Sequence, residues 1–143
     1  MNSTHSTIRH FRLEDIEAVV HMLGAEADFT NQPQWAMDAE GVHSTWLRHH
    51  INWQSDIFVA EVGGQLAAYV PMFVTRREGT LQAHVWGPSF YPERGDARLD
   101  DALLTRLVEW SVAVGATHII GRATETDHRQ HALYQRHSFV VER

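Results

Sequence analysis

Histidine dominates the reactive side chains of this sequence, with 11 copies in 143 residues. A histidine can ligate a metal ion, move a proton near neutral pH, or simply lie on the surface. His128 and His131 are three positions apart, a spacing that places two side chains on one face of a helix. No carboxylate or third histidine completes a metal site beside them. We therefore expect scattered histidines, no metal, and a positive charge that rises steeply below about pH 6.5.

The rest of the composition narrows the possible chemistry. The sequence has no cysteine, which excludes disulfides and thiolate catalysis and fits a cytoplasmic protein. Its 12 Lys and Arg against 18 Asp and Glu give a net charge of −6, so we expect no nucleic-acid partner. No apolar run of about 18 residues is present, so we expect no membrane span. The length suits one domain, and no linker or repeat divides residues 1–143.

Hydrophobic periodicity predicts the elements that must position these side chains. The N-terminal part indicates a strand, a helix that stops at Gly24, a polar turn over 28–33 and a second helix. Three strands in a meander follow, with turns at Gly63–Gly64 and 76–80. A long helix, a strand, a helix and a final strand complete the order. The expected elements are 8–11, 13–23, 35–53, 57–62, 65–74, 81–91, 99–114, 117–120, 127–136 and 139–141.

Proline and glycine interrupt two of the expected strands. Pro71 indicates a bulge or an edge position in its strand, and Gly87–Pro88 should break or splay the next one. The long helix allows the meander to cross over to a parallel neighbour. The predicted fold class is therefore α/β, with one mixed, mostly antiparallel sheet and helices on both faces.

Three segments, in this order, resemble the GNAT N-acetyltransferase superfamily over nearly the whole chain. Residues 58–69 (FVAEVGGQLAAY) resemble its central hairpin. Residues 87–95 (GPSFYPERG), followed by Ala-Leu-Leu at 102–104 and Trp110, resemble its cofactor-binding strand, loop and helix. Residues 132–139 (ALYQRHSF) resemble its last helix and turn. The resemblance implies a single GNAT-like domain.

The resemblance implies a function, the direct transfer of an acetyl group from acetyl-CoA to the amine of a small molecule. In the family a splayed strand binds the pantetheine arm, and Ser89, Phe90 and Tyr91 occupy that stretch here. Tyr134 matches the tyrosine that protonates the departing thiolate. Asp127 stands where the family often has an asparagine that contacts the cofactor. The pyrophosphate would lie against the next loop and helix N-terminus, which comprise Arg94, Gly95, Asp96, Ala97, Arg98 and Leu99.

This loop departs from the family pattern Arg/Gln-x-x-Gly-x-Gly/Ala. Neither expected glycine is present in either register, and Arg98 or Leu99 would hinder the close backbone approach that glycine permits. The acids of this segment either cap the helix or crowd a bound anion, whereas its arginines would offset their charge. We expect weak binding of acetyl-CoA. The acids are Asp96, Asp100 and Asp101, and the arginines are Arg94 and Arg98.

The resemblance places the acceptor wall in the first two helices, where Glu26, Asp28 and Trp35 lie. Acids with aromatics suit a cationic amine, although surface acids and a core tryptophan explain the same pattern. His84 lies on the cofactor strand where a general base could act, and Glu61 is an alternative. Two hypotheses stay open: an N-acetyltransferase, with a homodimer as one assembly found among relatives, and a non-catalytic GNAT-fold module that binds a small ligand or another protein.

Overall fold

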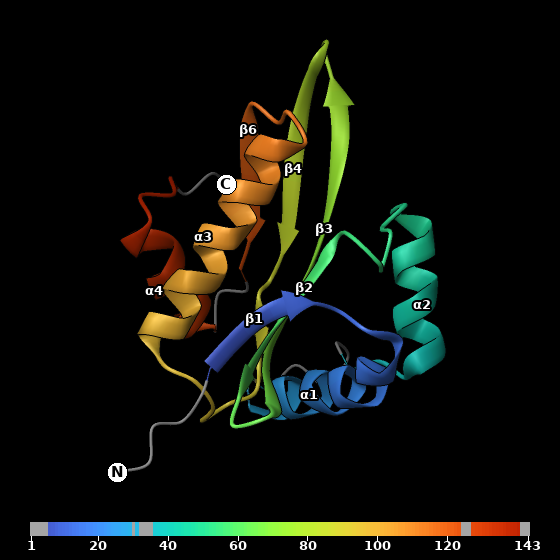
Figure 1. Cartoon of the computed structure of the whole chain (residues 1–143), viewed down its shortest axis with the longest axis vertical. Helices are drawn as coiled ribbons and strands as arrows, with labels where there is room; N and C mark the ends of the chain where they lie inside the picture. The colour runs from blue at the N-terminus through green and yellow to red at the C-terminus, as the bar shows by residue number, and fades with distance from the viewer. Residues whose placement is uncertain (1–5, 30, 32–35, 124–126, 141–143) are drawn as a thin grey trace.

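The structure is a computed structural model, and it describes residues 6–29, 31, 36–123 and 127–140 (Figure 1). Within these residues the chain forms alternating runs of strands and helices in the predicted order. The elements are β1 (Ser6–His10), a 3₁₀ turn η1 (Leu13–Asp15), α1 (Ile16–Phe29), α2 (Ala39–Arg48), β2 (Ile57–Val62), β3 (Gln65–Arg77), β4 (Thr80–Trp86), β5 (Ser89–Phe90), α3 (Ala97–Ala113), β6 (His118–Arg122) and α4 (His128–Arg136).

The strands form one mixed sheet in the order β1-β2-β3-β4-β6, with β5 paired to β3. The pairings of β1 with β2, β2 with β3, and β3 with β4 and β5 are antiparallel. Only the pairing of β4 with β6 is parallel within the described sheet, and α3 supplies the crossover between them. The α/β class with a mostly antiparallel sheet is thus confirmed.

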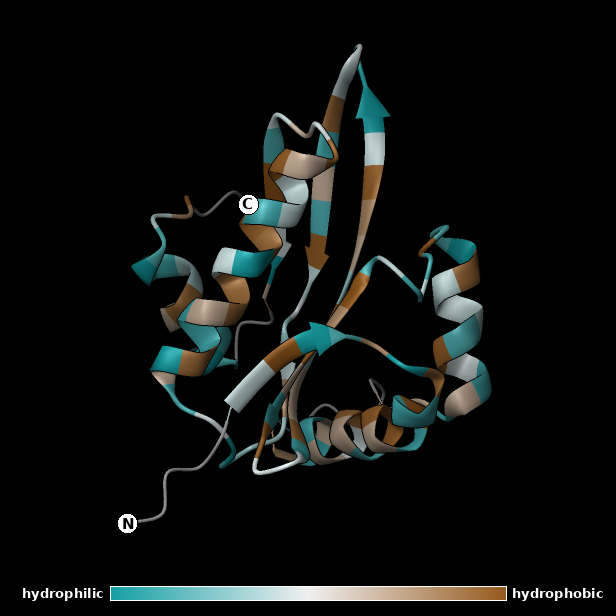
Figure 2. Cartoon of the chain, viewed as in Figure 1, coloured by the Kyte–Doolittle hydropathy of each residue, from teal (hydrophilic) through white to brown (hydrophobic). Residues whose placement is uncertain are grey.

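Helices cover both faces of the sheet, α1 and α2 on one side and α3 and α4 on the other (Figure 1). The alternation of β2 shows how the two cores arise, because successive side chains of a strand point to opposite faces. Ile57 and Val59 join the core under α1 and α2, whereas Phe58 and Ala60 join the core under α3 and α4. Hydrophobic and hydrophilic residues alternate along α1 and α3 accordingly (Figure 2).

Strand β3 passes from one set of neighbours to another at Pro71. The Met72 N–H donates to the Asp56 carbonyl on the β2 side, so the nitrogen of Pro71 faces the opposite edge. That edge is where the chain breaks between β4 and β5, so no ladder bond is lost by the missing N–H of proline. The expected bulge lies earlier in β3, where Ala67 is the extra residue between Leu66, the partner of Glu61, and Ala68, the partner of Ala60.

Several expected boundaries were wrong. Strand β3 continues to Arg77, through residues expected in a turn, and α3 begins at Ala97. Helix α1 continues past Gly24 to Phe29, because a glycine costs a helix only about 1 kcal/mol and the turn beyond it buries Ala27. Helix α2 is shorter than expected, since Asp38 caps its N-terminus through the Gly41 N–H. The first two residues of the expected last strand, Phe139 and Val140, lie in no strand, and residue 141 is outside the described residues.

Candidate functional site

A cleft of about 1700 Å³ opens between the helices of the two faces, where β4 ends and β5 begins. Helices α1 and α2 form one wall, and β6 with α4 forms the other. Four of the predicted site residues line it, namely Glu26, Ser89, Asp127 and Tyr134. The sequence therefore brings residues more than a hundred positions apart to one cavity.

The strand break gives this cleft an open strand edge. Strand β4 pairs with β6 as far as Trp86 and Arg122, whereas β5 pairs only with β3 among the described strands. The predicted break at Gly87–Pro88, a cis peptide, is confirmed. The backbone groups that this edge turns away from β3 are therefore left for side chains or for a ligand.

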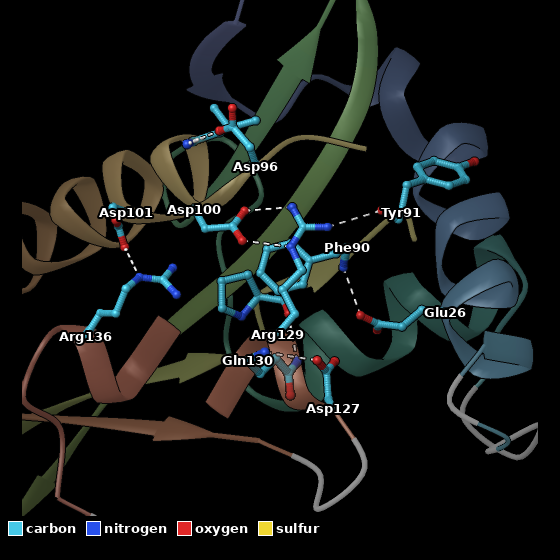
Figure 3. A network of polar contacts seen from close by, with 12 residues as sticks. Glu26, Phe90, Tyr91, Asp96, Asp100, Asp101, Asp127, Arg129, Gln130 and Arg136 are labelled. Carbon is cyan, nitrogen blue, oxygen red and sulfur yellow. Dashed lines mark hydrogen bonds and ion pairs between the residues drawn. The ribbon is translucent and has the colours of Figure 1, made fainter. Parts of the chain in front are cut away.

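Side chains of the protein form hydrogen bonds with several backbone groups along this edge (Figure 3). The Gln130 amide Nε2 donates to the Pro88 carbonyl at 2.7 Å. The Phe90 N–H donates to Oε2 of Glu26 at 2.8 Å. The Tyr134 hydroxyl donates to the Gly87 carbonyl. A pantetheine arm would have to displace these side chains and replace their hydrogen bonds in order to bind the same edge.

Tyr134 is held deep in the cleft wall by a glycine of β6. A Cβ atom at Gly121 would lie 2.5 Å from Cζ of Tyr134, so only glycine lets the ring approach the strand this closely. Burial, reinforced by the charge of Asp127, raises the pKa of Tyr134 well above its ordinary value. The phenol therefore keeps its proton at neutral pH and donates it in a hydrogen bond to the Gly87 carbonyl.

Glu26 reaches the same cleft from α1. Burial raises its pKa from 4.5 to about 7, while the Phe90 N–H opposes the rise and the nearby Asp127 adds to it. Asp127 caps α4 through the Gln130 N–H at 3.0 Å, and burial raises its pKa too. A carboxylate that titrates near neutral pH can accept a proton from a substrate in the cleft.

The acids at the N-terminus of α3 are held within the fold. Asp96 caps the helix through the Leu99 N–H at 2.9 Å, as one of the two sequence interpretations expected. Asp100 is 2% exposed and forms a two-pronged ion pair with Arg129 of α4, each contact 2.7 Å long (Figure 3). Asp101 binds Arg136 and His137 of the same helix at 3.0 Å.

Arg129 was missed by sequence reasoning, because a lone arginine in a helix gives no signal of its partner. Its guanidinium lies 4.0 Å above the ring of Phe90 and also reaches the Tyr91 carbonyl at 3.4 Å. Gly95 is part of the same arrangement, since a Cβ there would lie 3.1 Å from Nη2 of Arg129. The loop therefore contains one glycine that a close approach requires, although not where the family pattern has it.

The remaining cofactor residues of the prediction lie apart from the cleft. Arg94 donates to the Leu66 carbonyl at 2.8 Å and stacks 4.0 Å from the Tyr91 ring, beside a smaller hollow of about 260 Å³. Ala97 and Arg98 are exposed in the first turn of α3, and Leu99 is buried in the core. Thus only part of the predicted cofactor set surrounds one cavity.

Of the predicted catalytic and acceptor residues, three lie away from the cleft wall or outside the described chain. His84 stacks on Phe73 at 4.7 Å and bonds the Thr75 hydroxyl at 2.8 Å. Burial lowers its pKa, and its buried Nδ1 has no hydrogen-bond partner among the described residues. Asp28 is exposed on α1. Trp35 lies outside the described residues. The alternative base, Glu61, pairs with Arg9.

Two further surveys concern only the described parts of the chain. No group of three or more His, Cys, Asp or Glu side chains there is arranged to hold a metal ion. No helix there combines the length and apolar character needed to cross a membrane.

No protein-family profile matches the sequence, and no curated protein matches it either. Solved structures do match over almost the whole chain. A GNAT-family acetyltransferase from Streptococcus pneumoniae matches with a TM-score of 0.74 and 16% identity, over 96% of this chain and 86% of that one. The aminoglycoside N-acetyltransferase AAC(6')-Iy, in complex with CoA, matches with a TM-score of 0.74 and 12% identity, over 99% and 93%.

A protein from Bacillus halodurans C-125 described as a transcriptional regulator matches with a TM-score of 0.77 and 18% identity, over 97% of this chain and 95% of that one. At such low identity the matches establish the fold alone. Together with the sheet order and the broken strand, they show that this chain has the fold of the GNAT acetyltransferase superfamily.

Proposed function

We propose that the protein is an N-acetyltransferase that uses acetyl-CoA to acetylate the amine of a small molecule. One observation carries the proposal. The cleft at the strand break holds a protonated phenol, Tyr134, and a carboxyl group that titrates near neutral pH, Glu26. A proton donor and a proton acceptor in one cavity are what amide formation from an amine and a thioester requires. The CoA-bound aminoglycoside acetyltransferase of the same fold supports the use of acyl-CoA.

The cleft residues fit a pantetheine arm in part. The edge of β5 has no strand partner on the cleft side within the described sheet, and the cavity is large enough for an extended ligand. The Pro88 carbonyl and Phe90 N–H of that edge would bind the arm once Gln130 and Glu26 release them. Acetyl-CoA would supply the acetyl group as a thioester. For the pyrophosphate, the N-terminus of α3 offers the end of a helix dipole.

The proposed roles follow from where each side chain lies. Glu26 accepts the proton that the attacking amine loses as its C–N bond forms. Tyr134 holds its proton at the Gly87 carbonyl, at the strand break, and gives it to the thiolate sulfur as the C–S bond breaks. We therefore prefer Glu26 to His84 as the base, because Glu26 lines the cleft and His84 does not.

The test combines cofactor binding with thiol release. Thermal unfolding is followed with acetyl-CoA, CoA and ATP; saturation at 100 times the dissociation constant adds about 2.7 kcal/mol, or roughly 5 to 10 °C. Amines are then screened with a thiol reagent that detects released CoA. The protein itself does not react with the reagent, because it has no cysteine. Tyr134→Phe should lower turnover and leave CoA affinity nearly unchanged. Full activity in this variant would remove the tyrosine from the mechanism.

A second function, a non-catalytic binding module, is favoured by one specific observation. The edge groups at Pro88 and Phe90 are already bonded to side chains of the protein itself. If these bonds are too stable to exchange, the cleft would take a ligand without a pantetheine arm. If millimolar acetyl-CoA did not raise the unfolding temperature, the result would favour the non-catalytic binding module.

A further inference from the structure

The charges that line the cleft are divided between its two ends. The carboxylates that line it are Glu26 and Asp127, which meet near the edge of β5. Among the described residues, none that lines the side toward α2 and β6 is a carboxylate. It carries cationic and titratable groups instead, namely Arg48, His49, His118 and Arg122.

Arg122 faces the α2 side of the sheet. Its neighbour Gly121 lies against Tyr134 of α4, and successive residues of a strand point to opposite faces. Its register partner is Trp86, the last residue of β4 before the strand break. Arg122 thus lies beside the point where the reacting groups of the proposed function would meet.

Arg48, from the last turn of α2, approaches the same region. His49 lies near both arginines. Its ring is 4.3 Å from that of Trp86, and its pKa is lowered mainly by burial and further by the charges of Arg48 and Arg122. Neither arginine forms an ion pair or a hydrogen bond with any other residue that the structure describes. Two arginines from different elements therefore share one wall of the cleft, and no described residue there supplies a counter-charge.

We propose that the acceptor amine carries an anionic group, a carboxylate or a phosphate, that Arg48 and Arg122 bind. This inference rests on the proposed function. A guanidinium presents paired N–H donors whose geometry matches these two anions. Binding of the anion at this wall would leave the amine of the same molecule directed toward Glu26 and the strand break.

The inference differs from the acceptor wall that the sequence suggested. Acids with aromatics predicted a cationic acceptor, but the exposed Asp28 does not line the cleft. A polycationic amine would meet Arg48 and Arg122 as like charges, which disfavours its binding. The acceptor class that fits is a small amine with a net charge near zero, such as an α-amino acid or an amine that bears a phosphate.

The test compares matched acceptors at one ionic strength. Glycine is paired with glycinamide, and O-phosphoethanolamine with ethanolamine, so that only one member of each pair carries the anion. Because the anion also makes the amine more basic, kcat/KM is calculated for the unprotonated amine. With saturating acetyl-CoA, this kcat/KM for one anionic member should exceed that of its partner without the anion by roughly tenfold or more. Which pair shows the preference distinguishes the carboxylate from the phosphate. Equal rates within both pairs would overturn the inference while leaving the acetyltransferase function intact.

Substitutions of the two arginines test whether they cause the preference for an anionic acceptor. Arg122→Gln and Arg48→Gln should each reduce the preference roughly tenfold, mainly through KM, and leave acetyl-CoA binding unchanged. Arg76→Gln is the matched control, since Arg76 is exposed at the far end of β3 and does not line the cleft. An unchanged preference in both cleft variants would also overturn the inference.

A failure of the proposed function is distinguishable from a failure of this inference. If no amine is acetylated, calorimetry with glycine and O-phosphoethanolamine measures anion binding directly. Binding that Arg122→Gln abolishes and Arg76→Gln retains would support an anion site in a non-catalytic module. No binding of either compound to the native protein would leave the arginine pair without an anion and refute the inference.

Discussion

Replacing Glu26 by glutamine should make the protein more stable at neutral and alkaline pH. Glutamine keeps an acceptor oxygen for the Phe90 N–H but has no charge to bury. The carboxyl group of Glu26 is costly to ionise in this position, because burial and the neighbouring Asp127 raise its pKa from 4.5 to about 7. The variant therefore removes a penalty that the native chain carries.

The sign and size follow from linkage. An acid whose pKa is higher in the folded state holds its proton more tightly when folded, so stability falls as pH rises from about 4.5 to about 7. Below that window the native protein and the variant should be equally stable. Above it the variant should be more stable by roughly 3 kcal/mol, which corresponds to about 10 °C for a domain of this size.

The assay is thermal or urea unfolding of both proteins between pH 5 and pH 8.5. The 11 histidines contribute to both curves, so the difference between the two curves isolates residue 26. Glu17→Gln, a change of the same kind at an exposed position on α1, is the control and should give a flat difference. A difference that is also flat for Glu26→Gln would refute the burial of this carboxylate and its assignment as the base.

Other predictions concern the wall that α4 contributes. Arg129→Met should cost about 3 to 5 kcal/mol in urea unfolding, because it leaves Asp100 buried without a partner, and adding Asp100→Asn should restore part of the loss. A cost below about 1 kcal/mol would show that the pair is solvated. Gly121→Ala should lower the free energy of unfolding by about 1 to 3 kcal/mol through overpacking against Tyr134, and an unchanged free energy would contradict that contact. Asp101→Asn, at a pair whose side chains are 38% and 40% exposed, should change stability by less than about 1 kcal/mol.

The elements that the sequence predicted best are those with a strong local pattern. The leucine stripe of α3 repeats on one buried face, whereas β2 begins with a continuous apolar run that is buried on both faces. Each pattern is visible within its own segment. Glycine propensity is a local quantity and predicts an end of α1 at Gly24, whereas the burial of Ala27 and the bond from Phe90 to Glu26 in the added turn depend on distant parts of the chain.

The site was predictable only where a resemblance aligned its residues. Tyr134 and Ser89 were assigned from their places in such segments, and both line the cleft. The bond from Phe90 to Glu26 joins residues 64 positions apart, and no periodicity indicates such a pair. The same holds for Arg48 and Arg122, which share a wall only because α2 and the end of β6 meet across Trp86.

The structure shows how far the acids at the N-terminus of α3 would repel a bound anion. From the sequence, the three aspartates of this segment either cap the helix or crowd a bound pyrophosphate. In the fold, Asp100 is neutralised by Arg129, and Asp101 faces Arg136 and His137, so neither adds an uncompensated charge at the helix N-terminus. What remains against cofactor binding is the carboxylate of Asp96, which already accepts from the Leu99 N–H, and the side chains of Arg98 and Leu99 where glycine would allow a close approach. Replacing Asp100 to favour anion binding would therefore leave Arg129 without its ion-pair partner and destabilise the fold. Arg98→Gly instead removes a side chain that hinders the approach of the cofactor.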